Sequence, residues 1–301
     1  MHARRLLTFA WSASVIAFAL VGWALSLWTF VMFWPGAGYD AHTYWQAARD
    51  VVAGSSPYSG TYGGLQGFRY APPLAALLAP GAFVSFDAFK LVMLALNVGA
   101  LRYAVGSWRW AGIMLVNPLV LHELYLGNVN FPIAAALYAA FRSSTSPLAF
   151  AGLAKLSPFF VLPQLLRSGR RLKPFLVTLG AAIALTLPVL SLWPAWASAL
   201  LTSPTPPGTL LFDPGPRLLL AVCLVAVAWY RRADWIAALA ATIAVPILWP
   251  STLVILLAPA RMLVEEVVAS RALGRRVNVE RAQETGRTGS AWPWRPRPRA
   301  G

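Results

Sequence analysis

Long apolar runs constrain this chain more than any other feature of its sequence. The first run, residues 6–33, holds no charged residue and exceeds the roughly 20 residues that a helix needs to cross the hydrocarbon core of a bilayer. Of all 301 residues, 58% are hydrophobic and 12% are charged, which leaves too little polar surface for a soluble globule of this size. The sequence therefore predicts an all-α, polytopic membrane protein and excludes a soluble enzyme.

The basic residues predict how the chain crosses the membrane. The formal net charge is +15, but Lys and Arg lie at the ends of apolar runs, as in cytoplasmic loops, so we expect no nucleic-acid partner. Besides the N-terminus, the predicted cytoplasmic points are Arg102 with Arg109, Arg142, residues 167–173, Arg231 with Arg232, and the tail. The predicted extracytoplasmic points are residues 34–70, residues 122–130, the surroundings of Lys155, residues 202–217 and residues 249–251.

Several apolar segments are too short to cross the membrane and return as complete helices. Residues 146–166 are interrupted by Pro158 and Pro163, which predicts paired half-helices or a re-entrant loop lining a cavity. Residues 71–106 are compatible with one crossing or with two. We expect about eight to ten crossings or half-crossings over residues 1–260. The tail, residues 261–301, is basic and rich in Pro and Arg, and we expect it to be mostly disordered in the cytoplasm.

The first extracytoplasmic loop, residues 34–70, carries the residues that most strongly indicate chemistry. Residues 41–53 have the spacing of an amphipathic helix, which predicts a helix lying at the outer membrane interface. Asp40 stands four residues before Tyr44, so both side chains share one face of this helix. Asp40 is either the N-cap of the helix or a general base that takes a proton from a hydroxyl group.

Polar residues recur where the rest of the chain is apolar. Arg69, in the segment FRYAPP, either binds a phosphate or anchors the chain at headgroup depth. The segment HELYLGNVN, residues 122–130, is either a site or a buried hydrogen-bond network. Lys155 needs a partner, which is either a phosphate or the carboxylate of Glu123 or Asp40. Arg217, in the motif DPGPR together with Asp213, is predicted to be a solvated turn residue.

No cofactor is predicted from the motifs of this sequence. It contains no P-loop, no GxGxxG before a helix, no HExxH and no GxSxG nucleophile elbow, so nucleotide-driven chemistry has no visible site. The three histidines, His2, His42 and His122, are too scattered to indicate a metal centre. The single cysteine, Cys223, excludes an intrachain disulfide and a metal site built from cysteines.

The order of these motifs resembles glycosyltransferase family 87, the polyprenyl-phosphate-mannose-dependent alpha-mannosyltransferases of the GT-C class. The N-terminal signature of that family is similar to D-x3-Y at Asp40 and Tyr44, PY at residues 57–58 and YxPP at residues 70–73. Three later elements of the family, GQxN, Lys-x-x-Pro and SP-x-x-W/H, are similar to LGNVN at 126–130, LAKLSP at 153–158 and LWPSTLVILLAP at 248–259. The chain departs from the family where Asn128 replaces Gln.

The resemblance implies a GT-C-like bundle at the plasma membrane of a bacterium, with its active site on the extracytoplasmic face. It implies an inverting enzyme that moves a hexose, with mannose as the first candidate, from a polyprenyl-monophosphate donor to a hydroxyl of an envelope glycolipid or glycan. The aspartate that acts as the base in the family corresponds to Asp40. No metal is expected.

Roles in such a site follow from the resemblance and from the chemistry of the side chains. We expect the donor phosphate to contact Arg69, Lys155 and His122. We expect the sugar and the acceptor to contact Tyr44, Tyr70, Glu123, Asn128 and Asn130. The alternatives are a multispanning transporter or flippase for a lipid-linked sugar, and a noncatalytic relative of the family.

Overall fold

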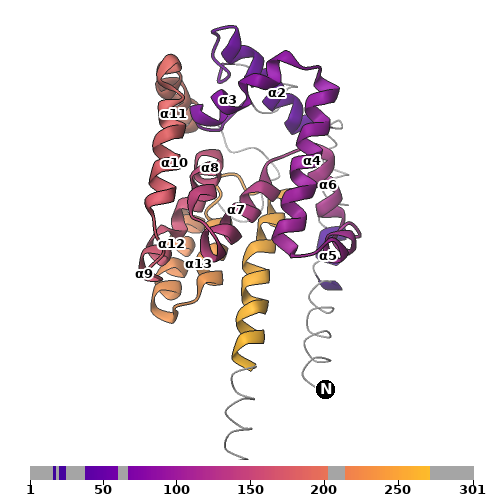
Figure 1. The fold of residues 1–301 in the computed structure, drawn as a ribbon, viewed down its shortest axis with the longest axis vertical. Coiled ribbons are helices and arrows are strands. Elements are labelled where there is room, and N and C mark those ends of the chain that lie inside the picture. The colour runs from indigo at the N-terminus through magenta and orange to yellow at the C-terminus, as the bar shows by residue number, and fades with distance from the viewer. Residues whose placement is uncertain (1–15, 18–19, 25–37, 60–66, 203–213, 272–301) are drawn as a thin grey trace, which may run out of the picture. The chain divides into compact units, whose positions relative to one another are not determined.

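The computed structural model describes residues 16–17, 20–24, 38–59, 67–202 and 214–271 (Figure 1). In this part of the chain the regular structure is helical and contains no strand, which confirms the predicted all-α class there. Most of the predicted first span, residues 6–33, lies outside the described residues, as do Asp213 and most of the predicted tail. The chain divides into two compact units, residues 1–262 and 263–301.

The elements of the first unit are mostly short helices. In chain order they are α2 (Tyr39–Val52), α3 (Pro72–Leu78), η2 (Ala79–Phe83), α4 (Phe86–Val105), α5 (Trp108–Met114), α6 (Pro118–Leu126), α7 (Asn130–Arg142), α8 (Ser146–Lys155), η3 (Ser157–Val161), α9 (Leu162–Arg167), α10 (Lys173–Ala184), η4 (Leu187–Val189), α11 (Leu192–Thr202), α12 (Pro214–Arg231), α13 (Asp234–Ile243) and η5 (Pro250–Leu256).

Proline and polar caps explain where many of these helices begin. Proline occupies the first or second position of several of them, including α3, α6, α8 and α9, where its missing N–H costs nothing. The side chains of Ser85, Ser107 and Asn117 cap α4, α5 and α6 by accepting hydrogen bonds from the first turn. Each cap satisfies a backbone donor that the helix itself leaves unpaired.

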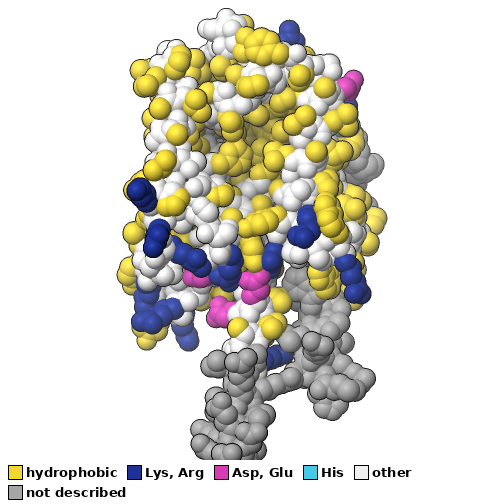
Figure 2. Space-filling view, in the orientation of Figure 1, with side chains coloured by type: hydrophobic (Ala, Val, Ile, Leu, Met, Phe, Trp, Pro, Cys, Tyr) yellow, Lys and Arg dark blue, Asp and Glu magenta, His cyan; other side chains and the backbone are white. Residues whose placement is uncertain are grey.

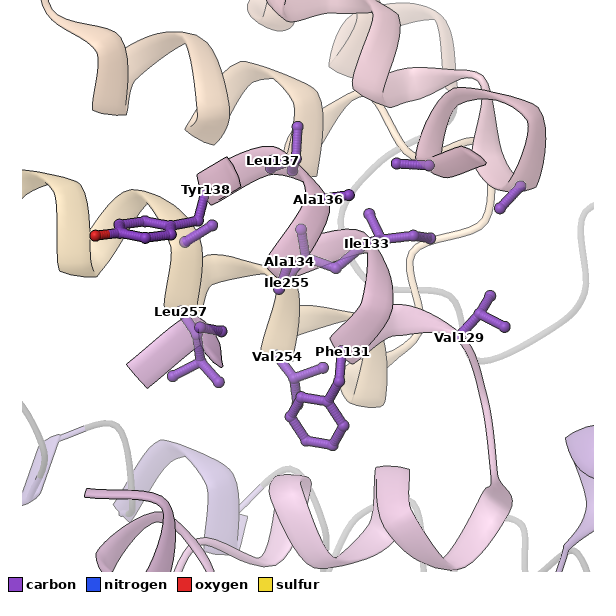
Figure 3. Close-up of a cluster of buried hydrophobic side chains, with 14 of the residues drawn as sticks. Val129, Phe131, Ile133, Ala134, Ala136, Leu137, Tyr138, Val254, Ile255 and Leu257 are labelled. Atoms are coloured by element: carbon purple, nitrogen blue, oxygen red, sulfur yellow. The ribbon is translucent and has the colours of Figure 1, made fainter. Parts of the chain in front are cut away.

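Helix α7 lies at the centre of the core. Its side chains are buried on almost every side, as expected for a helix that is apolar all round. It packs against α4, α8 and η5, and Figure 3 shows Phe131 and Ala134 facing Val254 and Ile255. The late segment around residues 250–257 is therefore part of the same core as the segment that begins at Asn130.

One described helix, α4, is long and apolar enough to cross a membrane. Helices α6 and α7 are long and apolar enough to cross a membrane only when they are taken together, and the chain bends by 109° between them. By length and composition the described residues therefore hold one span, or two if the bent pair counts as one. The 20 residues of α4 extend over about 30 Å, which matches the hydrocarbon core of a bilayer.

The structure resolves two segments that the sequence left open. Residues 71–106 hold one span-length helix, because α3 and η2 pack against α2 instead of extending α4. Asp87 and Lys90 form an ion pair of 2.9 Å on the first turns of α4 and not in a separate turn. Residues 146–166 are interrupted as predicted, but the break lies at Leu156, whose φ is 56°.

Helix α4 separates two ends of the first unit. At its beginning, Phe86 packs edge-on against His42 of α2, with ring centroids 5.1 Å apart. At its end, the carbonyl oxygen of Tyr103 accepts a hydrogen bond of 2.6 Å from Arg261, whose guanidinium lies over the ring of Tyr138 in α7. The beginning of α4 therefore belongs to the end of the unit that contains α2, and its last turn belongs to the opposite end.

The prediction that Arg217 is a solvated turn residue is wrong. Its side chain is buried at the beginning of α12, where Nη1 donates to the Val245 oxygen at 2.9 Å and Nη2 to the Pro246 oxygen at 2.7 Å. These carbonyls belong to the two residues that follow the C-cap of α13, Ala244, outside the helical hydrogen-bond pattern. The planar guanidinium satisfies both of them at once.

Candidate functional site

Asp40 lies in the first turn of α2 and does not cap it. The helix begins at Tyr39, and its N-cap is Gly38, which has a φ of 73° and makes no side-chain capping bond. The alternative that Asp40 is the N-cap is therefore wrong. Instead, Oδ2 of Asp40 accepts a hydrogen bond of 2.8 Å from Nδ2 of Asn128. The carboxylate also lies near the positive end of the helix dipole.

A close approach between α2 and α6 brings Asn128 to Asp40. The backbone N–H of Gly38 donates to the Tyr125 oxygen at 2.7 Å. Gly127 caps the end of α6 with a φ of 70°, and a Cβ added there would lie 2.9 Å from Cβ of Ala41. Only glycine fits both the left-handed backbone and the narrow gap. The bend after α6 is thereby held directly against the first turn of α2.

The amide of Asn128 is oriented by three donors. Its Oδ1 accepts from the hydroxyl of Tyr44 at 2.9 Å and from the backbone N–H of Val129 at 2.6 Å. The hydroxyl of Tyr70 lies 3.4 Å from the same oxygen and 2.7 Å from the hydroxyl of Tyr44. Because Oδ1 faces these donors, the amide nitrogen must face the carboxylate of Asp40.

Two residues to which the sequence assigned no contact, Tyr58 and Trp196, bind the backbone at residues 69 and 70. The hydroxyl of Tyr58 donates to the Tyr70 oxygen at 2.9 Å, and Nε1 of Trp196 in α11 donates to the Arg69 oxygen at 3.1 Å. The N–H of Ala71 donates to the Leu153 oxygen in α8 at 3.1 Å. Tyr58 belongs to the PY motif at residues 57–58, whereas no local pattern identifies Trp196.

The ammonium of Lys155, the last residue of α8, supplies the positive charge of the site. It interacts electrostatically with Glu123 and Asp40, but within the described residues its ammonium forms no hydrogen bond and no ion pair within 4.0 Å. The alternative of a close structural ion pair with either carboxylate is therefore not observed. The ammonium is available to an anionic ligand.

Glu123 and Asn130 form a buried polar pair with incomplete hydrogen bonding. Both are fully buried, and Oε1 of Glu123 accepts from the backbone N–H of Asn130 at 3.2 Å. Oε2 of Glu123 and both polar side-chain atoms of Asn130 have no hydrogen-bond partner. Buried polar atoms are rarely left unpaired, so such a group calls for a ligand or an ordered water. The predicted hydrogen-bond network is present, but these three buried atoms have no partner among the described residues.

Burial affects the protonation of the Asp40 carboxyl group and of the hydroxyls of Tyr44 and Tyr70. Burial raises the pKa of Asp40 to about 6, although the positive charge of Lys155 and the hydrogen bond from Asn128 lower it. At neutral pH the carboxyl group is therefore mainly ionised. Burial also raises the pKa of Tyr44 and of Tyr70 above the ordinary range, so both keep their protons.

Within the described part of the chain, Arg69 forms no bond with this group, and His122 points to a different side of α6 from Glu123. Arg69 is half-buried, burial lowers the pKa of its guanidinium, and its side chain forms no hydrogen bond with the group among the described residues. His122 precedes Glu123 by one position, so the two side chains point about 100° apart around α6. The candidate residues that the structure does bring together are Asp40, Tyr44, Tyr70, Glu123, Asn128, Asn130 and Lys155.

The geometry of the group suits reactions at a hydroxyl. The carboxylate of Asp40 can accept a proton, and the ammonium of Lys155 can stabilise a developing negative charge. In the part of the chain that the structure describes, no group of three or more His, Cys, Asp or Glu side chains is placed to hold a metal ion. In comparisons with known proteins, the chain matches no family model, no curated protein and no solved structure.

Proposed function

We propose that this protein is a polytopic membrane glycosyltransferase that moves a hexose from a polyprenyl-monophosphate donor to a hydroxyl of an envelope glycolipid or glycan. The observation that carries the proposal is the Asp40 carboxylate. Asn128 holds one of its oxygens, the other has no partner among the described residues, and Lys155 contributes a nearby positive charge. The order of motifs that resembles glycosyltransferase family 87 supports the same activity.

The surface of the first unit supports a membrane location. Large apolar side chains are strongly exposed on several helices, such as Leu201 at 87%, Phe83 at 78% and Leu219 at 70%. Figure 2 shows hydrophobic side chains over much of the visible face, including a recessed region between α10 and α4. A contiguous apolar surface of this kind is stable only when lipid or another apolar partner covers it.

In the proposed reaction Asp40 acts as the general base. It accepts the proton of the acceptor hydroxyl while that oxygen attacks the anomeric carbon of the donor sugar. The bond between the anomeric carbon and the phosphate oxygen breaks, the electron pair stays on the phosphate, and polyprenyl monophosphate leaves with inversion at the anomeric carbon. Lys155 stabilises the charge on the departing phosphate. Asn128 orients the base, and the unpaired atoms of Glu123 and Asn130 bind sugar hydroxyls.

The test is the transfer of labelled mannose from polyprenyl-phosphate-mannose in proteoliposomes that contain the full chain. Loss of a positioned base commonly costs about 10²- to 10⁴-fold in rate, so we expect Asp40→Asn to lower transfer by at least that order. Asp87→Asn is the matched control, because Asp87 is an exposed carboxylate on α4 whose partner is Lys90. Its transfer rate should equal that of the wild type.

Two outcomes contradict the proposal in different ways. Equal transfer by the wild type and by Asp40→Asn removes Asp40 as the base. No transfer by the wild type, with mannose or with pentose donors on the same lipid, rejects a transferase.

The bend of 109° between α6 and α7 favours a lipid-linked-sugar flippase as the second candidate, since discontinuous helices are typical of transporters. A fluorescent lipid-linked sugar that equilibrates across the bilayer only when the protein is present identifies this alternative.

A further inference from the structure

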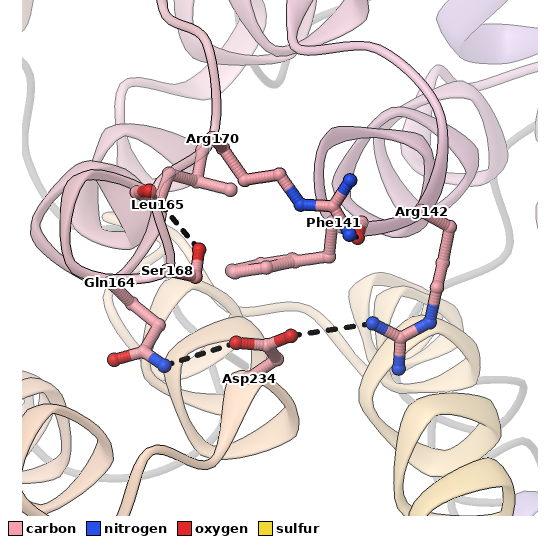
Figure 4. A network of polar contacts seen from close by, with 7 residues as sticks. All are labelled: Phe141, Arg142, Gln164, Leu165, Ser168, Arg170 and Asp234. Carbon is pink, nitrogen blue, oxygen red and sulfur yellow. Dashed lines mark hydrogen bonds and ion pairs between the residues drawn. The ribbon is translucent and has the colours of Figure 1, made fainter.

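Basic side chains gather at the end of the first unit that lies opposite α2. The guanidinium of Arg170 donates to the Phe141 oxygen at the end of α7, and Arg142 pairs with Asp234 at 3.3 Å (Figure 4). These contacts, together with those of Arg261, bring the last turns of α4 and α7, the end of α9 and the beginning of α13 to one place. Figure 2 shows Lys and Arg side chains concentrated there.

The cations at this end fall into two groups. One group is used by the fold: Arg142, Arg170 and Arg261 bond to Asp234 or to backbone carbonyls, and Arg102 and Arg167 lie over the rings of Trp108 and Trp229. The other group has exposed side chains and, within the described residues, no hydrogen bond, ion pair or ring contact. We call this group the basic end, and its members are Arg109, Arg171, Lys173, Arg231 and Arg232.

Few carboxylates are available to neutralise the basic end. The acidic residues described in the first unit are Asp40, Asp50, Asp87, Glu123 and Asp234. Asp40, Asp50 and Asp87 lie on α2 or at the beginning of α4, and Glu123 lies in the candidate site. Asp234 alone lies at the basic end, and it already accepts from Arg142 and from Gln164. Within the first unit, the five side chains therefore have no carboxylate partner, and the next described carboxylates, Glu265 and Glu266, belong to the second unit.

We propose that the basic end is a binding surface for the headgroups of anionic phospholipids. A lipid phosphate accepts hydrogen bonds from guanidinium and ammonium groups. Exposed aromatic residues precede two of these cations in the sequence, Trp108 before Arg109 and Tyr230 before Arg231, and such a combination is typical of the depth where headgroups meet hydrocarbon. The length of α4, about 30 Å, separates the basic end from α2 by the thickness of a hydrocarbon core.

This inference rests on the membrane location in the proposed function and is independent of sugar transfer. The experiment measures binding of fluorescent phosphatidylglycerol and of phosphatidylcholine to the detergent-solubilised full chain. The variants are Arg171→Gln with Lys173→Gln, and Arg231→Gln with Arg232→Gln. The control for charge is Arg49→Gln with Lys90→Gln, which removes the same charge at the end of the unit that contains α2, where Lys90 pairs with Asp87 and Arg49 lies over the ring of Trp45.

The wild type should bind phosphatidylglycerol more tightly than phosphatidylcholine, and the preference should weaken as salt is added. Each double variant at the basic end should weaken binding of phosphatidylglycerol on the order of tenfold, and the control should leave it unchanged. Because all five side chains are exposed and unpaired, thermal stability should not change.

Several outcomes overturn the inference. It fails if the wild type binds both lipids equally, if the control weakens binding as much as the variants, or if a single-stranded oligonucleotide displaces the anionic lipid at an equal concentration of charge. A wild type that transfers sugar without preferring the anionic lipid rejects this inference alone. A wild type that prefers the anionic lipid but transfers no sugar with any donor rejects the proposed transferase alone.

Discussion

At the scale of single residues, the chemistry of Asp40 depends on its burial. A general base works only in its ionised form, and burial raises the pKa of Asp40 to about 6. The rate of sugar transfer should therefore rise as the pH increases through about 6 and level off above it. The measurement is kcat/KM for the donor between about pH 5 and pH 8. A rate that is constant over this range contradicts the assignment of Asp40 as the base.

The positive charge of Lys155 should determine the pH at which the rate of sugar transfer rises. Its positive charge lowers the pKa of Asp40, so replacing it with an uncharged side chain removes a stabilisation of the carboxylate and raises that pKa. In Lys155→Met the midpoint of the pH profile should move to higher pH, and the plateau should fall because the phosphate loses its cation. Arg69→Met is the control, since Arg69 does not affect the pKa of Asp40. A midpoint that moves equally in both variants argues against a specific effect of Lys155.

Spacing along the sequence was sufficient to predict part of this residue-scale arrangement. The four-residue separation of Asp40 and Tyr44 placed them on one helix face, and both do reach Asn128. The partner itself could not be deduced, because Asp40 and Asn128 are 88 positions apart and only the packing of α2 against α6 brings them together. Trp196 was missed for the same reason, since it acts on the backbone of a residue 127 positions away.

At the scale of elements, the packing of α2 against α6 should depend on the size of residue 127. Gly127→Ala adds a left-handed backbone penalty and a Cβ only 2.9 Å from that of Ala41. Gly169→Ala is the matched control, because Gly169 has nearly the same φ, 69°, with no atom within 4 Å of an added Cβ. Gly127→Ala should lower the free energy of unfolding by about 1–3 kcal/mol more than the control does, as measured by chemical denaturation in detergent.

The same substitution should also affect the proposed chemistry. A shift of α2 away from α6 separates Asp40 from Asn128, so transfer should fall in Gly127→Ala and be maintained in Gly169→Ala. Equal losses of stability and of transfer in the two variants show that backbone conformation alone is responsible, and that the close approach of the helices is not important.

A second element-scale prediction concerns the ties between α7, α9 and α13. Asp234 at the beginning of α13 accepts from Arg142 at 3.3 Å and from Gln164 at 3.0 Å (Figure 4). Asp234→Ala removes one acceptor from two partly buried donors, so it should lower the free energy of unfolding by about 1–3 kcal/mol. Asp87→Ala, which breaks an exposed pair within one helix, should cost less than about 1 kcal/mol. Similar losses in the two variants contradict this difference.

The hydrophobic periodicity and the prolines of the sequence predicted where helices lie more accurately than where those helices begin. The amphipathic pattern at residues 41–53 corresponds to α2, whose buried face includes Tyr44, Ala47 and Ala48. The beginning of that helix was misplaced because Gly38 caps it through backbone conformation, without a polar side chain. Arg217 was misjudged because its position in a Pro-rich motif suggested solvent, whereas the carbonyls that it satisfies lie beyond another helix, α13.

At the scale of the whole molecule, charge distribution predicted which segments lie together. The segments predicted to be extracytoplasmic near Asn128 and Lys155 lie with α2, and predicted cytoplasmic points such as Arg142 and Arg170 lie at the opposite end. The number of crossings could not be predicted in the same way. The helices on either side of the breaks at Leu156 and between α6 and α7 are each shorter than a full span, and α7 and most of α8 are buried inside the protein, so length and hydropathy alone do not count them as crossings.

The proposed orientation of the molecule can be tested directly with engineered cysteines. Ser59 and Ser168 are both exposed, and the hydroxyl of each donates one local hydrogen bond to a backbone oxygen, so cysteine should be tolerated equally at both positions. Cys223 is exposed on α12 and must first be replaced by serine. In that background, a membrane-impermeant maleimide added to intact cells should label Ser59→Cys strongly.

Ser168→Cys, near the basic end, should be labelled only after the cells are permeabilised. The physical reason is that charged residues do not cross the hydrocarbon core, so segments at opposite ends of a helix about 30 Å long must face opposite compartments. Labelling of both positions in intact cells contradicts the proposed topology. If only Ser168→Cys is labelled from outside, the orientation is reversed, and Asp40 then faces the cytoplasm, where the proposed envelope acceptor is absent.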